Sequence, residues 1–177
     1  GPSDRSFKIK VPLGYGSLFY DQKFNWKYET EPELELKGRR MYWPRGKVLG
    51  GSSAINAMVY VRGHPNDYEE WADVAPSWNW SNVEPYFKKI ESWKGEDSPV
   101  RGKSGPVGIS NVENDVHPLT NKYLEAGQEL GFPHNKDYNG NHMEGVAVYQ
   151  TTTSNGLRVS SASAYIAKKK GSKNLKV

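Results

Sequence analysis

Tyr42–Ala72, the stretch that decides the fold, reads YWPRGKVLGGSSAINAMVYVRGHPNDYEEWA. Within it, the run Gly50-Gly51-Ser52-Ser53 precedes an apolar segment, Ala54–Val61, that is compatible with a helix. Glycine allows a positive φ and a close approach of the backbone to a ligand. Serine caps helices, and the free amides of a helix start attract anions. The stretch therefore predicts a phosphate or pyrophosphate cradle, although ordinary loop–helix junctions share this composition.

The composition is that of a globular chain. The 177 residues suffice for a sizeable core, and 36% are hydrophobic and 25% charged. The net charge of +4 is scattered, and its densest part, Lys168–Lys176, is expected to be a solvated face. Because no dense basic patch or recognisable module appears, we expect no nucleic-acid partner.

Several other classes of site are disfavoured. The chain has no cysteine, which rules out disulfides and thiol chemistry but does not fix the compartment. No apolar run reaches the roughly 18 residues of a membrane span. Asp137–Asn141 imitates the start of a calcium loop, but His142 stands where a glycine is needed, so no metal is expected.

Short strands, several helices and long loops predict a mixed α/β fold. We expect an extended piece at Phe7–Val11, a strand within Asn25–Thr30, and a strand at Met41–Trp43. Further along the chain we expect the following elements: a helix after His64–Asp67, a helix opened by a capping box at Ser81–Glu84 with Tyr86 and Phe87 in the core, a strand at Val107–Ile109, a helix from Pro118 to Gly131, a strand at Val146–Thr153, a turn at Asn155–Gly156, a helix from Ser160 or Ser161 to Lys169, and a strand start at Asn174–Val177.

Gly46–Asn56, followed by Tyr60, Gly63 and Glu69, closely resembles the first signature of the glucose–methanol–choline (GMC) flavin oxidoreductases. The flanking Trp43-Pro44-Arg45 and Tyr60-Val61-Arg62-Gly63 are most similar to the choline dehydrogenase branch. The resemblance extends over nearly the whole chain, including Asn155–Tyr165. It implies a part of the two-domain, FAD-binding GMC fold, with residues 76–177 leading into the substrate domain.

The resemblance also implies a cofactor, FAD, and the residues that contact it. Ile55 occupies the position of the histidine that carries covalent flavin in some members, which implies non-covalent FAD. The implied activity is oxidation of a small-molecule alcohol, with hydride transfer to flavin N5. The implied FAD contacts are Val48, Leu49, Gly50, Gly51, Ser52, Ser53, Asn56, Ala57, Met58 and Val59, the last four against the isoalloxazine ring.

Parts of the family pattern have no counterpart here. The Gly-x-Gly-x-x-Gly unit and the C-terminal histidine with its His or Asn partner are missing, so no catalytic residue is predicted. We therefore expect an internal fragment, partnered by complementary N- and C-terminal segments, that binds FAD weakly and catalyses nothing alone. Alternatives are a hydroxynitrile lyase or fatty acid photodecarboxylase of the same fold, or a non-catalytic binding module.

Overall fold

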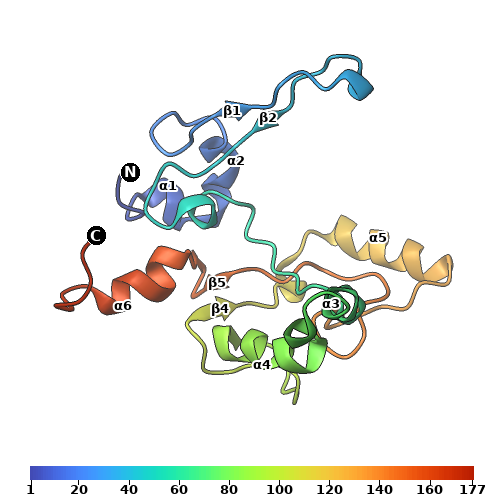
Figure 1. The fold of residues 1–177 in the computed structure, drawn as a ribbon. Helices are drawn as coiled ribbons and strands as arrows, with labels where there is room; N and C mark the ends of the chain where they lie inside the picture. The colour runs from blue at the N-terminus through green and yellow to red at the C-terminus, as the bar shows by residue number, and fades with distance from the viewer. The chain divides into compact units, whose positions relative to one another are not determined.

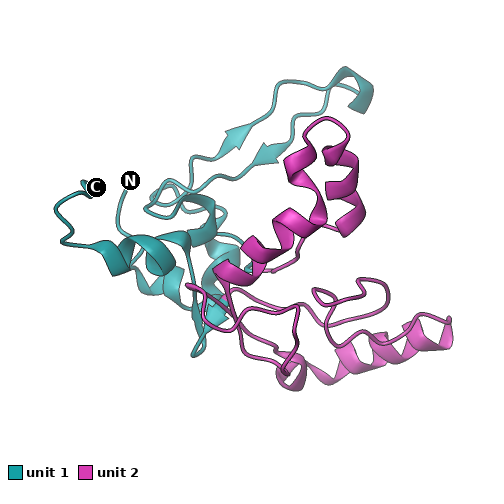
Figure 2. Cartoon of the chain, turned by 60° about the horizontal axis from the view of Figure 1, so that its bottom comes forward, with its two compact units in different colours: residues 1–58, 153–177 teal, residues 59–152 magenta.

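The computed structural model describes residues 1–177 and divides them into two compact units. Unit 1 contains Gly1–Met58 and Thr153–Val177, and unit 2 contains Val59–Thr152; Figure 2 colours them teal and magenta. Both units combine helices with short strands, in agreement with the mixed α/β class predicted from the sequence. No helix is both long and apolar enough to cross a bilayer.

Short helical segments build the core of unit 1. At the N-terminus, α1 (Phe7–Lys10), a 3₁₀ turn (Pro12–Gly14) and α2 (Tyr15–Leu18) follow one another. The extended piece expected at Phe7–Val11 is therefore wrong, because the Ser6 carbonyl accepts from the amides of Ile9 and Lys10 and starts a helical turn. The buried cluster of this unit consists of Ile9, Leu18, Phe24, Val48, Ala54 and Ile55.

Two antiparallel hairpins complete unit 1. Strand β1 (Tyr28–Glu29) pairs with β2 (Tyr42–Trp43) at the base of a long ribbon, and both strands lie within segments predicted to be extended (Figure 1). A single 3₁₀ turn (Leu34–Leu36) lies in this ribbon. The second hairpin joins β5 (Thr153–Ser154) to β6 (Leu157–Arg158). Its turn at Asn155 and Gly156, with φ of 51° and 72°, confirms the predicted Asn-Gly turn.

The C-terminal helix of unit 1 lies where the sequence predicted it. A π-helical segment (Ala162–Ile166) continues into α6 (Ala167–Lys169). Ser160 precedes it, and its Oγ accepts a hydrogen bond from the Ser163 amide at 3.1 Å. The strand expected at Asn174–Val177 does not form.

The helix expected at Ala54–Val61 is wrong. Only a 3₁₀ turn (Gly51–Ala54) forms, and the chain then runs in an irregular path. Met58 has a φ of 65°, which interrupts a right-handed helix, and the Asn56 carbonyl is occupied by a side chain from another segment.

Three capped helices belong to unit 2: α3 (Pro65–Ala72), α4 (Trp80–Ile90) and α5 (Pro118–Glu129). His64 and His117 cap α3 and α5 by accepting backbone amides at Nδ1. The cap of α4 is Asn79 rather than the predicted Ser81, because the Asn79 side chain accepts from the Asn82 amide at 3.0 Å. Two 3₁₀ turns (Pro76–Trp78 and Glu113–Asp115) lie between these helices.

The aromatic side chains of α4 differ in their burial. Phe87 packs against the rings of Tyr68 and Trp80. Tyr86 was expected in the core but is 66% exposed. Phe87 is therefore partly buried against neighbouring rings, and no side chain of α4 is fully buried, so the predicted core position is wrong for Tyr86 and met only in part by Phe87.

One parallel strand pair lies in unit 2. β3 (Glu91–Trp93) pairs with β4 (Val107–Ile109), of which only β4 was predicted. The strand expected at Val146–Thr153 is wrong, since this segment makes single bridges through Val146 and Thr151 before β5 begins. Its residues bond instead to three different neighbouring segments.

A buried ionic network holds unit 2 together. The Glu91 carboxylate, fully buried, accepts from Arg62 at 2.5 Å and from Arg101 Nε at 2.9 Å. Arg101 Nη1 also donates to Asp137 and to Gln150. Because removal of one partner would leave an unpaired buried charge, this network tightly couples β3 to the loops around it.

Candidate functional site

The signature loop of unit 1 folds back on itself at two glycines. A Cβ added at Gly46 would lie 2.2 Å from the Gly51 carbonyl oxygen, so only glycine fits there. The Gly46 amide donates to Ser52 Oγ at 3.1 Å, which closes the fold-back. We call residues 46–58 the signature loop.

One edge of the signature loop is bare. Gly51 has a φ of 57°, and a Cβ built on it would meet no atom within 4 Å. Ser52, Asn56 and Ala57 of the same loop are exposed. A backbone edge without side chains allows a flat or charged ligand to approach closely.

The opposite side of the loop is buried. Ile55 is 2% exposed and Met58 is 5% exposed, and both belong to the packed interior of unit 1. Val48 is also buried, so its side chain packs into the core. The predicted contacts therefore separate into residues that anchor the loop and residues that face outward.

Serine side chains fix the start of the loop. Ser53 Oγ donates to the Gly50 carbonyl at 2.6 Å, and Ser161 Oγ donates to the same carbonyl at 3.0 Å. The Ser161 amide donates to Ser53 Oγ at 2.9 Å. The segment before the C-terminal helix thus holds the Gly50–Ser53 turn.

An arginine fixes the end of the loop. Arg158, 4% exposed, donates from Nη1 to the carbonyl of Asn56 and to Asn56 Oδ1, each at 2.8 Å, and to the Ser53 carbonyl at 3.3 Å. Its Nε donates to the Ile9 carbonyl at 2.9 Å. Burial lowers the pKa of Arg158 to about 10, so the guanidinium stays charged at neutral pH.

Asn56 connects this arginine to the backbone beyond it. Its Oδ1 also accepts from the Met58 amide at 3.1 Å, which stabilises the left-handed conformation of Met58. Non-glycine residues held at positive φ are uncommon and concentrate at functional sites.

All the predicted FAD contacts except Val59 lie together in the signature loop. Val59 belongs to unit 2, where it bridges to Thr151 and is 41% exposed. Arg158 and Ser161 were not predicted as site residues. Their only signal was that both fall in Asn155–Tyr165, a segment already noted as similar to the family.

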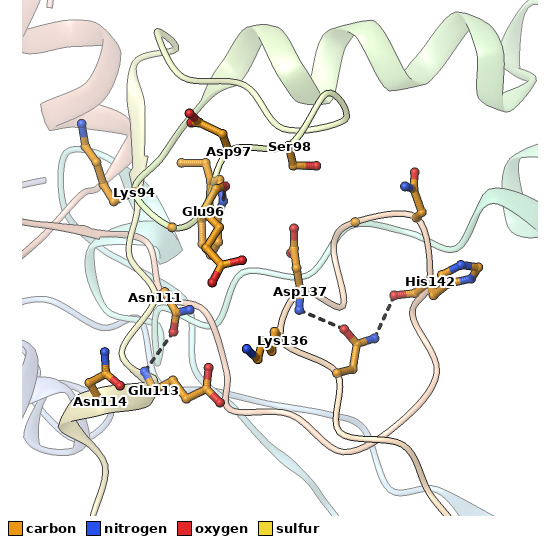
Figure 3. Close-up of a pocket in the computed structure, with 15 residues that line it drawn as sticks. Lys94, Glu96, Asp97, Ser98, Asn111, Glu113, Asn114, Lys136, Asp137 and His142 are labelled. Atoms are coloured by element: carbon orange, nitrogen blue, oxygen red, sulfur yellow. Dashed lines mark hydrogen bonds between the residues drawn. The ribbon is translucent and has the colours of Figure 1, made fainter.

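Unit 2 contains a polar pocket of about 780 Å³ (Figure 3). Two asparagine side chains that line the pocket make hydrogen bonds within loops. Asn135 donates to the His142 carbonyl at 2.8 Å, and Asn111 accepts from the Glu113 amide at 2.9 Å. No group of three or more His, Cys, Asp or Glu side chains could hold a metal ion. Asp137 is bound by Arg101 and Gln150. Asn111, Asn135 and Asp137 therefore make structural contacts within unit 2.

Comparison with known proteins identifies the family. Residues 15–177 match the family described as GMC oxidoreductase. The chain is 41% identical over its whole length to oxygen-dependent choline dehydrogenase of Photobacterium profundum, covering 32% of that protein. It is 42% identical to alcohol dehydrogenase (acceptor) of Pseudomonas putida, with 94% of this chain and 30% of that protein covered.

Comparison with solved structures supports the same family. Pyridoxine 4-oxidase from Mesorbium loti superposes on 99% of this chain with a TM-score of 0.91 and 34% identity, covering 35% of that chain. The chain thus spans about a third of the length of the relatives it matches. With a family match over residues 15–177 and this agreement in fold, the chain belongs to the GMC oxidoreductase family.

Proposed function

We propose that this chain forms the flavin-contacting part of an FAD-dependent oxidoreductase that acts on the CH–OH group of an alcohol. The family uses FAD, and two relatives are named choline dehydrogenase and alcohol dehydrogenase. The single observation that carries the proposal is the bare edge of the signature loop at Gly51, flanked by exposed polar groups.

The residues of the loop fit the cofactor. Ser52 Oγ already accepts a hydrogen bond, so its hydroxyl hydrogen can be donated to a ligand. Asn56 Oδ1 is engaged, which leaves its amide hydrogens for the same use. Bound FAD would supply the hydride-accepting chemistry.

The proposed mode of binding is non-covalent. Ile55, where some family members carry a flavin-linked histidine, has no nucleophilic atom, and its side chain lies in the core. The ten predicted residues from Val48 to Val59 remain the proposed contacts. Of these, Gly50, Gly51, Ser52, Asn56 and Ala57 are the ones we expect closest to the cofactor.

We propose that other polypeptide segments supply the rest of the enzyme. We propose that residues 76–177 lead into the substrate domain, and that complementary N- and C-terminal segments supply the adenine half-site and the catalytic residues. An alcohol is the proposed substrate of that assembly.

A matched pair of variants tests the cofactor site. Gly51 and Gly38 both have positive φ and open space around a built Cβ, but Gly38 lies in the turn of the β1–β2 ribbon. Asparagine tolerates this backbone conformation, so Gly51→Asn and Gly38→Asn differ mainly in what the new side chain obstructs. We expect Gly51→Asn to raise the Kd for FAD by about tenfold or more, and Gly38→Asn to leave it unchanged. Equal Kd values in both variants would contradict the proposed site.

Activity of the chain alone gives a second test. We expect the purified 177-residue chain to bind FAD weakly and to show no bleaching of flavin absorbance when an alcohol is added. Alcohol-dependent bleaching would contradict the proposal that catalytic residues lie in other segments.

A further inference from the structure

Arg158 lies 102 residues from Asn56 in sequence, yet its guanidinium makes two bonds to that one residue. The Arg158 side chain donates to the carbonyl oxygens of both Ser53 and Asn56. A third segment, α1, is attached through the Ile9 carbonyl. The planar fork of arginine suits such multiple acceptors, whereas the point charge of lysine does not.

The shape of the exposed loop edge depends on these bonds. Asn56 is exposed, and an exposed asparagine samples several rotamers unless its side chain is held. Here its Oδ1 receives one hydrogen bond from Arg158 and one from the Met58 amide. The first bond fixes the side chain, and the second fixes Met58 at a φ of 65°.

We infer that Arg158 is a positioning residue for cofactor binding: acting through Asn56, it holds the signature loop in the shape that receives the flavin. This inference rests on the proposed function. The inference adds Arg158, a residue of the β5–β6 hairpin that does not itself touch the ligand, to the proposed cofactor site. Arg158 lies on strand β6, so the β5–β6 hairpin supports the signature loop.

Charge and burial favour this role. The oxygens that accept from Nε and Nη1 of Arg158 carry no formal charge, so only dipoles partner the cation, and its buried Nη2 has no partner. Such an arrangement holds backbone carbonyls firmly, because a charge-assisted hydrogen bond is stronger than a neutral one. Loss of the guanidinium would release the carbonyls of Ser53 and Asn56 together.

Amide hydrogen exchange of the 177-residue chain, without flavin, measures the loop directly. We expect Arg158→Lys to speed exchange of the Met58 amide by about tenfold or more, since exchange reports local opening. Arg40→Lys is the matched control, because Arg40 is an exposed arginine of the same unit in the β1–β2 ribbon. Unchanged exchange at Met58 in Arg158→Lys would overturn the inference.

Asn56 variants keep the test decisive if Arg158→Lys does not fold. Asn56→Asp retains an acceptor oxygen in place of Oδ1, and Asn56→Ala removes it. We expect protection of the Met58 amide to persist in the first variant and to be lost in the second. Equal exchange in the two variants would overturn the inference.

A double-mutant cycle with FAD affinity as readout separates positioning from general stability. If Arg158 acts through Asn56, the loss in Asn56→Ala/Arg158→Lys should be smaller than the product of the single losses, by about fivefold. A purely structural arginine would give the full product, which would overturn the inference. Failure of the unaltered chain to bind FAD contradicts the proposed function instead, and the exchange data still decide whether Arg158 holds the loop.

Discussion

Gly46 shows how a single atom can decide the shape of the signature loop. We expect Gly46→Ala to lower the free energy of unfolding by about 2 kcal/mol, because the new methyl group overlaps the Gly51 carbonyl and the backbone has to shift. Gly16→Ala is the control, since its Cβ in α2 would meet no atom within 4 Å and alanine favours a helix. Denaturant unfolding measures both, and equal stability of the two variants would contradict the fold-back.

At the scale of a single residue, ionisation of Tyr60 makes the stability of unit 2 depend on pH. Burial, and then the charge of Glu91, raise the pKa of Tyr60 to about 12 from its ordinary 10.0. The folded state therefore keeps a proton that the unfolded state loses between these values, and the contribution to stability falls as pH rises from about 10 to 12.

The Tyr60→Phe variant should lack this slope. Chemical denaturation at several alkaline pH values would show it, with the near-ultraviolet absorbance of tyrosinate as a second readout. An identical slope in the variant would exclude Tyr60 as its source.

At the scale of elements, the cap of α4 is a testable case. Asn79→Ala should cost about 1 kcal/mol of stability, because the Asn82 amide loses its acceptor. Asn79→Asp keeps a carboxylate oxygen in the same place and should retain most of that stability. Thermal unfolding distinguishes the two, and the cap would be unimportant if both variants melted with the parent chain.

Local patterns predicted those elements whose determinants lie within a few residues. The Asn155–Gly156 turn, the helix beginning at Pro118 and strand β4 follow from residues that the elements themselves contain. The helix at Ala54–Val61 failed because Met58 has a positive φ and the Asn56 carbonyl bonds to Arg158, about a hundred residues away. Val146–Thr153 is rich in β-branched residues, as strands are, but its residues bond to separate segments, which no local pattern reports.

The candidate site divides in the same way. Gly50, Gly51 and Ser53 could be named from the signature, because the loop that they form is local in sequence. Arg158 and Ser161 could not, because their role exists only once the β5–β6 hairpin lies against that loop.

At the scale of the whole molecule, each unit has its own means of cohesion. Unit 1 has an apolar cluster, and unit 2 combines buried side chains such as Trp93 and Ile109 with the Glu91 network. Glu91→Ala should cost roughly 3–5 kcal/mol, since Arg62 would be left buried without a carboxylate and Arg101 would keep only that of Asp137. Hydrogen exchange at the Gly102 amide, which donates to Glu91, measures the loss; unchanged protection there would contradict the account.

The most direct test of the central claim is the hydrogen-exchange footprint of FAD on the 177-residue chain. If the signature loop contacts the cofactor, added FAD should slow exchange across residues 46–58 and leave the polar pocket around residues 93–98 and 135–142 unchanged. The claim would be contradicted if FAD protected that pocket, or any other segment, while exchange in the signature loop stayed the same.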